Sequence, residues 1–304
     1  MDPHHLQQSL LTTTITAATT DYDVRERTPL ALTSSHSTKT NVPSIIFRVF
    51  LISFVGIVSI WANHEASKGF SITIVNDAGK YSSSGKRFSI FYDSNDKATR
   101  ILLNTSIFVE KVLYPNQEIQ HNKKQIKGVT LRLASTNIPS IVSVHSPKPH
   151  EYVINLSPSL METSNNNELV VLAILQGLTR VWLWNGNGET PSVLMNGIVE
   201  YISNLAGFKS SDLSTFSEND SILREYNGIC WKDVDQRKVA GFFRYVDQSK
   251  PPIGGGGEVI RRLNILMKSG WHDSMVDDAL GMDGHHACAS YGLMIRHHHQ
   301  SSSL

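Results

Sequence analysis

The chain has 304 residues, a formal net charge of +1 at pH 7 and 40% hydrophobic residues, a composition near the globular average. A chain of this length can bury one sizeable core and carry appendages. Its lysines and arginines are spread along the sequence and form no basic stripe interleaved with aromatic residues. We therefore expect no nucleic-acid partner.

The first 43 residues differ from the rest in composition. The Thr-rich run at 12–20 cannot bury much apolar surface, so residues 1–43 are predicted to be a disordered N-terminal region. A transit peptide is the alternative, but the acidic residues Asp21, Asp23 and Glu26 are not typical of such a targeting sequence.

Residues 44–62 read SIIFRVFLISFVGIVSIWA and predict a membrane-targeting segment. The uninterrupted apolar part, 49–62, is so short that a signal-peptide core, a re-entrant segment and a buried helix compete with a spanning helix. Counting back through Ile45, with Arg48 reaching the headgroups, gives a marginal span. The long N-terminal extension favours a single-pass transmembrane signal anchor, and a cleaved signal with a secreted product is the alternative.

The charges around this segment predict its orientation. Lys39 and Arg48 precede the apolar core whereas Glu65 and Lys68 follow it, which places the N-terminus in the cytosol and the main domain in the lumen or outside the cell. Glycosylation sequons fit that side of the membrane and occur at Asn104, Asn155 and Asn219. We therefore expect a glycoprotein.

The first half of the main domain is predicted to be a small mixed sheet with one long helix. Alternating runs of β-branched and aromatic residues predict strands at 70–76, 88–92, 128–134 and 152–156. The spacing of apolar residues over 96–112, with Ile107 on the inward face, predicts a helix that ends before Pro115. The segment 138–150 is expected to be irregular.

The second half changes to helical periodicity. Helices are predicted at 168–184, 192–205, 234–247, 259–268, 273–280 and 287–295. A sheet followed by helices predicts an α+β domain over 70–296. The glycine run at 254–257 lacks the context of a phosphate-binding loop, and the His/Ser-rich tail at 297–304 is expected to bind metal only weakly.

Two segments carry a resemblance to a known family. Residues 176–188 read QGLTRVWLWNGNG and residues 191–201 read PSVLMNGIVEY. They resemble the motifs HEMTHVWQWNGNG and PGGLIEGIADY of the plant basic secretory proteins, a family of zincin-like peptidases. Residues 81–88 and 239–245 are similar to two further stretches of that family. The resemblance covers about 70–296 and implies a zincin-like fold.

The resemblance also implies a metal site that this chain has lost. In the family motif two histidines four residues apart bind Zn²⁺ from one helix face, and the glutamate between them activates water. The matching residues here are Gln176, Gly177 and Arg180. An amide oxygen is a poor zinc ligand, glycine cannot take a proton, and a guanidinium repels a dication. The third ligand and its supporting acid would fall at Asn196 and Glu200, so we expect neither metal nor cofactor.

The charges at these positions allow two arrangements. Arg180 either occupies the space of the metal and forms an ion pair with Glu200, or it turns outward while Glu200 lies on a solvated face. The rest of the motif predicts a structural role, in which aromatic rings fill core volume and Asn-Gly pairs form a tight turn between two helices. These structural residues are Trp182, Trp184, Asn185, Gly186, Asn187 and Gly188.

The two cysteines, Cys230 and Cys288, leave two possibilities open. They form a disulfide in an oxidising compartment, or they are two buried free thiols, because the sequence alone does not place their Cα atoms.

Three functional hypotheses follow. The first is a membrane-anchored, catalytically inactive pseudopeptidase whose inherited cleft binds an extracellular peptide or protein, with a defence-related role suggested by the family. The second is a hydrolase with a relocated active site built from His272, His285, His286, Asp277, Asp278 and Asp283. No nucleophile–base spacing is recognisable among them. The third is a gene product under weak constraint with no dedicated role.

Overall fold

A computed structural model describes most of the region after residue 68. It covers residues 69–79, 81–115, 121–162, 166–208, 229–232, 235–249 and 256–302, together with the helical residues 47, 49–56 and 59. The chain divides into two compact units at the boundary between residues 69 and 70. The two units are described separately.

The unit before residue 70 contains the described part of the predicted anchor. Residues 49–56 are helical and their side chains are exposed, whereas the other residues of 44–62 are described only at 47 and 59. Within the described part of the chain, no helix is both long enough and apolar enough to cross a bilayer. The predicted disordered region, 1–43, lies outside the described residues.

The unit after residue 69 is built on a four-stranded sheet. The strands are β1 (Ser71–Asn76), β2 (Gly128–Leu133), β3 (Val142–Lys148) and β4 (Glu151–Leu156), in the order β1-β2-β4-β3. Strands β1, β2 and β4 are parallel, and the edge strand β3 is antiparallel to β4. The sheet has one buried face, because Val129, Leu131 and Leu133 are buried while Thr130 and Arg132 between them are not.

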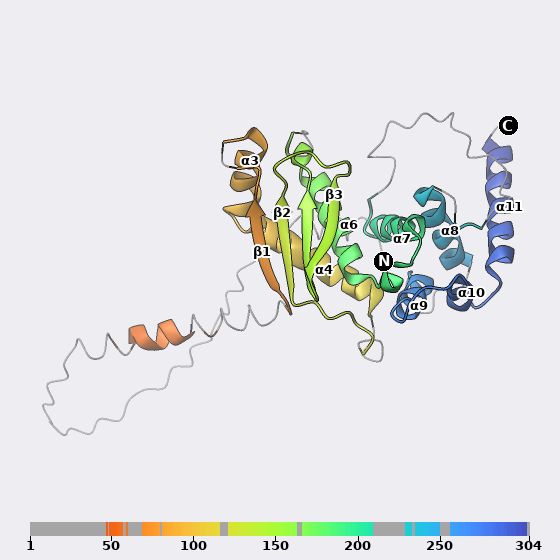
Figure 1. The fold of residues 1–304 in the computed structure, drawn as a ribbon, viewed down its shortest axis with the longest axis horizontal. Helices are drawn as coiled ribbons and strands as arrows, with labels where there is room; N and C mark the ends of the chain where they lie inside the picture. Colours follow the sequence, from red (N-terminus) through yellow and green to blue (C-terminus); the bar gives the residue numbers. More distant parts are fainter. Residues whose placement is uncertain are drawn as a thin grey trace, which may run out of the picture. The chain divides into compact units, whose positions relative to one another are not determined.

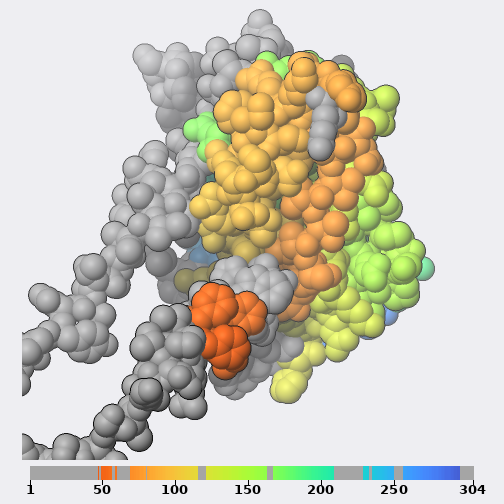
Figure 2. Space-filling model, turned by 90° about the vertical axis from the view of Figure 1, so that its left-hand side faces the viewer, coloured from red at the N-terminus to blue at the C-terminus, as the bar shows by residue number. Residues whose placement is uncertain are grey.

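Two long helices cover that face. Helices α4 (Lys97–Leu113) and α6 (Asn166–Trp182) lie behind the sheet in Figure 1, and their apolar sides form the core with the strands. Leu102 of α4, Leu131 of β2 and Ile154 of β4 are fully buried in this core. Figure 2 shows α3 (Ser83–Phe88) and α4 at the surface beside β1.

The remaining helices follow the sheet in sequence. They are α7 (Ser192–Leu205), α8 (Gln236–Ser249), α9 (Glu258–Leu266), α10 (Ser274–Leu280) and α11 (Gly284–Ser302). Short 3-10 turns lie at Pro158–Met161 and Gly186–Gly188. Helix α7 approaches α8 closely, since a Cβ atom on Gly197 would meet Cγ1 of Val239 at 2.3 Å. The prediction of an α+β domain with sheet first and helices after is confirmed.

The predicted strand at 88–92 is wrong. Helix α3 leads directly into a π-helical turn, Ser89–Asp93. Phe88 at the end of α3 and Tyr92 in the turn are buried, whereas Ile90 is exposed. A run of apolar residues this short fits the spacing of a strand and that of a helix. The helix is favoured because Ser82 caps its start, accepting a hydrogen bond from the main-chain N–H of Gly85 at 2.9 Å.

Two further expectations need correction. Ile107 of α4 is 65% exposed, because the buried stripe of that helix runs through Thr105, Ser106 and Val109 instead. The segment 138–150 contains strand β3, whose sequence VSVHSPK is polar and includes a proline. Such a composition is typical of an edge strand, where one side needs no ladder partner.

Candidate functional site

Helix α6 is buried on almost every side. Between residues 170 and 183 only two side chains are not buried, those of Gln176 and Arg180. They are four residues apart and therefore share one face of the helix. The two positions at which the resemblance places histidine ligands are thus the two that reach solvent.

Helix α7 supplies the opposite side of this site. Asn196 and Glu200 are also four residues apart and half-buried. Nη2 of Arg180 donates to Oδ1 of Asn196 at 3.1 Å, and Nη1 donates to the main-chain oxygen of Gln176 at 3.2 Å. We call Gln176, Gly177, Arg180, Asn196 and Glu200 the motif site.

Neither of the two arrangements that the sequence left open for Arg180 is found in the structure. The guanidinium hydrogen bonds to Asn196, one turn before Glu200 on α7, and the ion pairs among the described residues include none between Arg180 and Glu200. Burial lowers the pKa of Arg180 below its ordinary value. The outward orientation does not describe Arg180 either, since its side chain is half-buried and hydrogen-bonded.

Gly177 faces the sheet. A Cβ atom at this position would lie 2.6 Å from Cγ2 of Ile154 and 3.4 Å from Cγ2 of Val142. The helix therefore rests directly on β4 and β3. A carboxylate side chain at residue 177, where the resemblance places the catalytic base, would require Ile154 to move.

The donor set of the motif site does not fit a divalent metal. Arg180 holds a permanent positive charge between the two helices, and Asn196 Oδ1 is engaged by it. Among the described residues, no three His, Cys, Asp or Glu side chains are grouped as metal ligands. No step of a metal-dependent reaction can be assigned to these side chains.

A polar network that sequence reasoning missed caps the C-terminus of α6. Tyr114 Oη donates to the oxygen of Trp182 at 3.0 Å, and Lys124 Nζ donates to the oxygen of Leu183 at 2.8 Å. Asn264 accepts from the main-chain N–H of Trp184 at 2.9 Å and donates to Tyr114 Oη at 2.9 Å. These bonds satisfy orphan carbonyls of the helix end. The contributing residues are far apart in sequence, which explains why no local pattern indicated them.

Lys124 is the unusual member of that network. Its ammonium lies 4.9 Å from the ring centroid of Tyr152 and 5.6 Å from that of Trp184. Burial lowers the pKa of Lys124 to about 8. The same environment raises the pKa of Tyr114 to about 12, again chiefly through burial.

Both tryptophans of the motif are packed and hydrogen-bonded to other parts of the domain. Trp182 is 2% exposed, and its Nε1 donates to Oγ of Ser106 on α4 at 2.9 Å. Trp184 is half-buried, and its Nε1 donates to the oxygen of Asn122 at 3.0 Å. The two rings therefore fasten α6 to α4 and to the segment before β2.

The Asn-Gly pairs form the predicted turn between α6 and α7. Gly186, Asn187 and Gly188 all have positive φ, at 58°, 58° and 91°. The main-chain N–H of Gly188 bonds to the oxygen of Asn185 at 3.0 Å. Gly186 is required for a second reason, because a Cβ there would meet Cβ of Trp271 at 2.8 Å.

The last glycine of the run 254–257 donates its main-chain N–H to a carboxylate side chain. Asp247 of α8 accepts from the main-chain N–H of Gly257 and from the hydroxyl of Tyr201. Burial and the adjacent Asp247 raise the pKa of Tyr201 above its ordinary value. Residues 254 and 255 lie outside the described residues, and the described end of the run holds α7, α8 and α9 together.

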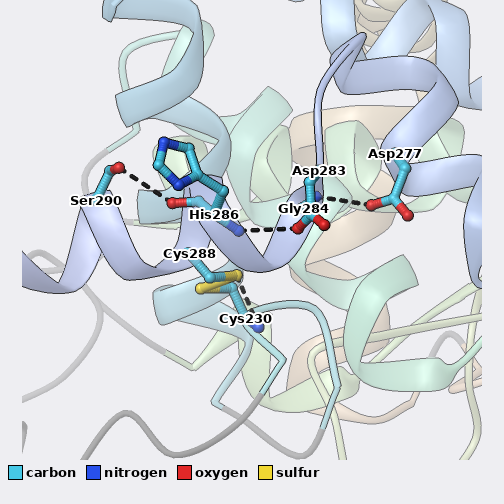
Figure 3. The surroundings of a disulfide bond; sticks show 7 residues. All are labelled: Cys230, Asp277, Asp283, Gly284, His286, Cys288 and Ser290. Carbon is cyan, nitrogen blue, oxygen red and sulfur yellow. Dashed lines mark hydrogen bonds between the residues drawn. A yellow bond between two sulfur atoms is a disulfide. The ribbon is translucent and has the colours of Figure 1, made fainter.

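The two cysteines are bonded to each other. Cys230 and Cys288 form a disulfide with Cα atoms 5.7 Å apart, and both are buried (Figure 3). The bond ties α11 to the segment at 229–232.

The acidic residues near the disulfide serve as helix caps. Asp283 Oδ1 accepts from the main-chain N–H of His286 at 3.0 Å, and Asp277 Oδ1 accepts from that of Gly284 at 2.8 Å (Figure 3). The first of these bonds is the main cause that lowers the pKa of Asp283. His272, Asp278, His285 and His286 are exposed. The geometry of the described residues gives the relocated active site no specific support.

The sequons fall on different kinds of structure. Asn155 lies on β4, where its Nδ2 is 3.3 Å from Ser143 Oγ and 3.2 Å from His145 Nδ1. Asn104 lies in the middle of α4. Asn219 is outside the described residues, and glycosylation at all three positions stays a prediction.

A comparison with models of protein families identifies the family of the domain that contains the motif site. The family described as peptidase of plants and bacteria matches residues 67–291, which is more than half of the chain. The predicted resemblance is thereby confirmed. No curated protein and no solved structure matches the chain.

Proposed function

The chain belongs to the family of peptidases of plants and bacteria, and we propose that within this family it binds a peptide segment without hydrolysing it. The observation that carries the proposal is the hydrogen bond between Arg180 and Asn196. It joins the positions of two metal ligands directly, so the helices stay together without a metal. The two helices of the site are kept while the residues for metal binding and proton transfer are absent, so binding is the activity that we propose for it.

The position of the motif site supports a peptide as the ligand. A Cβ atom built on Gly177 would lie 3.4 Å from Cγ2 of Val142, the first residue of β3, so the site adjoins the edge strand of the sheet. Strand β3 is paired on one side with β4 and is an edge of the sheet on the other. An extended peptide can add main-chain hydrogen bonds to such an edge, which is a common mode of peptide recognition.

We also propose that residues 44–62 anchor this domain to a membrane, with the domain on the lumenal or extracellular side. The apolar composition of the segment, the flanking charges and the three sequons support this orientation. Alkaline extraction of cell membranes and glycosidase treatment test it. Release into the supernatant together with an unchanged electrophoretic mobility would contradict it.

A combined binding and cleavage assay tests the central proposal. The full chain, purified in detergent, is incubated with a fluorescent peptide library and zinc, and retained and cleaved peptides are identified by mass spectrometry. We expect retained peptides of intact length. Chelator-sensitive cleavage would refute the proposal, and so would the absence of any retained peptide.

A further inference from the structure

Arg180 is a half-buried cation that neutral groups hold in place. Its two hydrogen bonds go to a side-chain amide oxygen and a main-chain oxygen, and neither acceptor carries a charge. No ion pair among the described residues includes Arg180. Burial is the cause that lowers its pKa, and no neighbouring carboxylate offsets this effect.

The guanidinium is also preorganised for a ligand. A guanidinium has five N–H donors, and the two hydrogen bonds leave others available. Because Asn196 and Gln176 fix its orientation, little side-chain entropy remains to be lost when an anion binds. The side chain is not fully buried, so a ligand in solution can reach it.

We infer that Arg180 makes the motif site a receptor for a carboxylate of the bound peptide. A planar guanidinium recognises a carboxylate through two parallel N–H···O bonds, and a partly desolvated charge strengthens such bonds. A metal ion at this position would bind the carbonyl oxygen of a peptide. An arginine in its place binds an anionic group instead.

This inference rests on the proposed function and adds its ligand chemistry. The carboxylate has two possible sources in a peptide, the C-terminus and an acidic side chain.

The test compares four heptapeptides of one alanine-rich sequence bound to the full chain. They carry a free C-terminal carboxylate, a C-terminal amide, an amide with a central Glu, or an amide with a central Gln. We expect one or both of the carboxylate peptides to bind about tenfold more tightly than the matched neutral peptide. The pair that shows the difference identifies the source of the carboxylate.

Variants assign the effect to Arg180. Arg180→Gln should abolish the difference between charged and neutral peptides, whereas Arg244→Gln, which removes an exposed arginine on α8, should preserve it. Since Arg180→Gln alters packing, Arg180→Lys provides a second variant. It keeps the positive charge but loses the planar pair of N–H donors, so it should reduce the difference between charged and neutral peptides without removing it.

The outcomes separate the two proposals. Equal affinity for all four peptides would overturn the carboxylate inference while the binding proposal stands. Cleavage of any peptide would overturn the binding proposal itself. Absence of binding by every peptide would overturn the inference, and the library assay would then decide the proposed function alone.

Discussion

Nη2 of Arg180 lies 3.1 Å from Oδ1 of Asn196, and this hydrogen bond connects α6 to α7 at two positions where the resemblance places metal ligands. A metal ion in a peptidase of this kind joins two helices and also performs chemistry. We propose that the hydrogen bond between the arginine and the asparagine supplies the first of these roles in this chain. On this proposal the structural role and the catalytic role of the site are separable.

A double-mutant cycle tests this connection. Arg180→Ala and Asn196→Ala should show a coupling of about 1.5 kcal/mol in the free energy of unfolding, because the bond is charge-assisted and partly buried. Chemical denaturation of both single variants and the double variant measures it. The matched cycle with Glu200→Ala should show weaker coupling to Arg180. Stronger coupling to Glu200 would mean that the ion pair, and not the Asn196 bond, joins the helices.

Gly177 should resist any larger side chain. Gly177→Ala places a Cβ atom against Ile154, which is expected to cost about 1–3 kcal/mol although alanine favours helices. The measurement is the urea midpoint of unfolding. Gln176→Ala, at the adjacent half-buried position, should change stability by only about 0.5 kcal/mol. A stabilised Gly177→Ala variant would show that the helix does not rest on Ile154.

Sequence alone located the motif site but not its bonding. The spacing of Gln176, Arg180, Asn196 and Glu200 predicted two helix faces that meet. Asn196 and Glu200 share one face of α7, so the choice between them as partner of Arg180 depends on how far α7 slides along α6. That displacement is set by packing between helices that are distant in sequence, and no local pattern encodes it.

The fold shows the same division between local and long-range information. Strongly periodic elements such as α4 and β2 were predicted within about two residues of their ends. The strand predicted at 88–92 was wrong because its apolar residues fit the spacing of a strand and that of a helix. Strand β3 was missed because its polar sequence resembles that of a loop. The cap formed by Tyr114, Lys124 and Asn264 could not be foreseen, because these residues meet only after folding.

Lys124 should make stability depend on alkaline pH. Its pKa falls to about 8 in the folded protein from the ordinary value of 10.5, so the unfolded chain binds more protons between these values. Unfolding free energy should therefore rise with pH through this window. Tyr114, whose pKa rises to about 12, opposes the trend above pH 10, so the comparison belongs between about pH 8 and 10.

The control for this pH dependence is Lys124→Met, which keeps an apolar chain in contact with Tyr152 and Trp184. Subtracting its pH profile from that of the wild type isolates the contribution of Lys124. A flat difference would show that the ammonium is not desolvated in the folded protein.

Reduction of the disulfide should destabilise the C-terminal half. Cys230 and Cys288 are 58 residues apart, and opening a loop of this length is expected to cost about 2–4 kcal/mol. Thermal unfolding with and without reductant measures the loss. The variant Cys230→Ala/Cys288→Ala should unfold at a temperature that reductant does not change. Equal stability of the oxidised and the reduced wild type would show that the disulfide does not stabilise the folded protein.

Zinc binding by the purified full chain measures most directly whether Arg180 has replaced the metal. The His-rich tail could bind zinc on its own, so His297, His298 and His299 are replaced by serine, and metal content is measured by mass spectrometry after equilibrium dialysis. We predict no stoichiometric zinc in this variant. One equivalent of zinc per chain that is lost on Asn196→Ala or Gln176→Ala would contradict the replacement of the metal site.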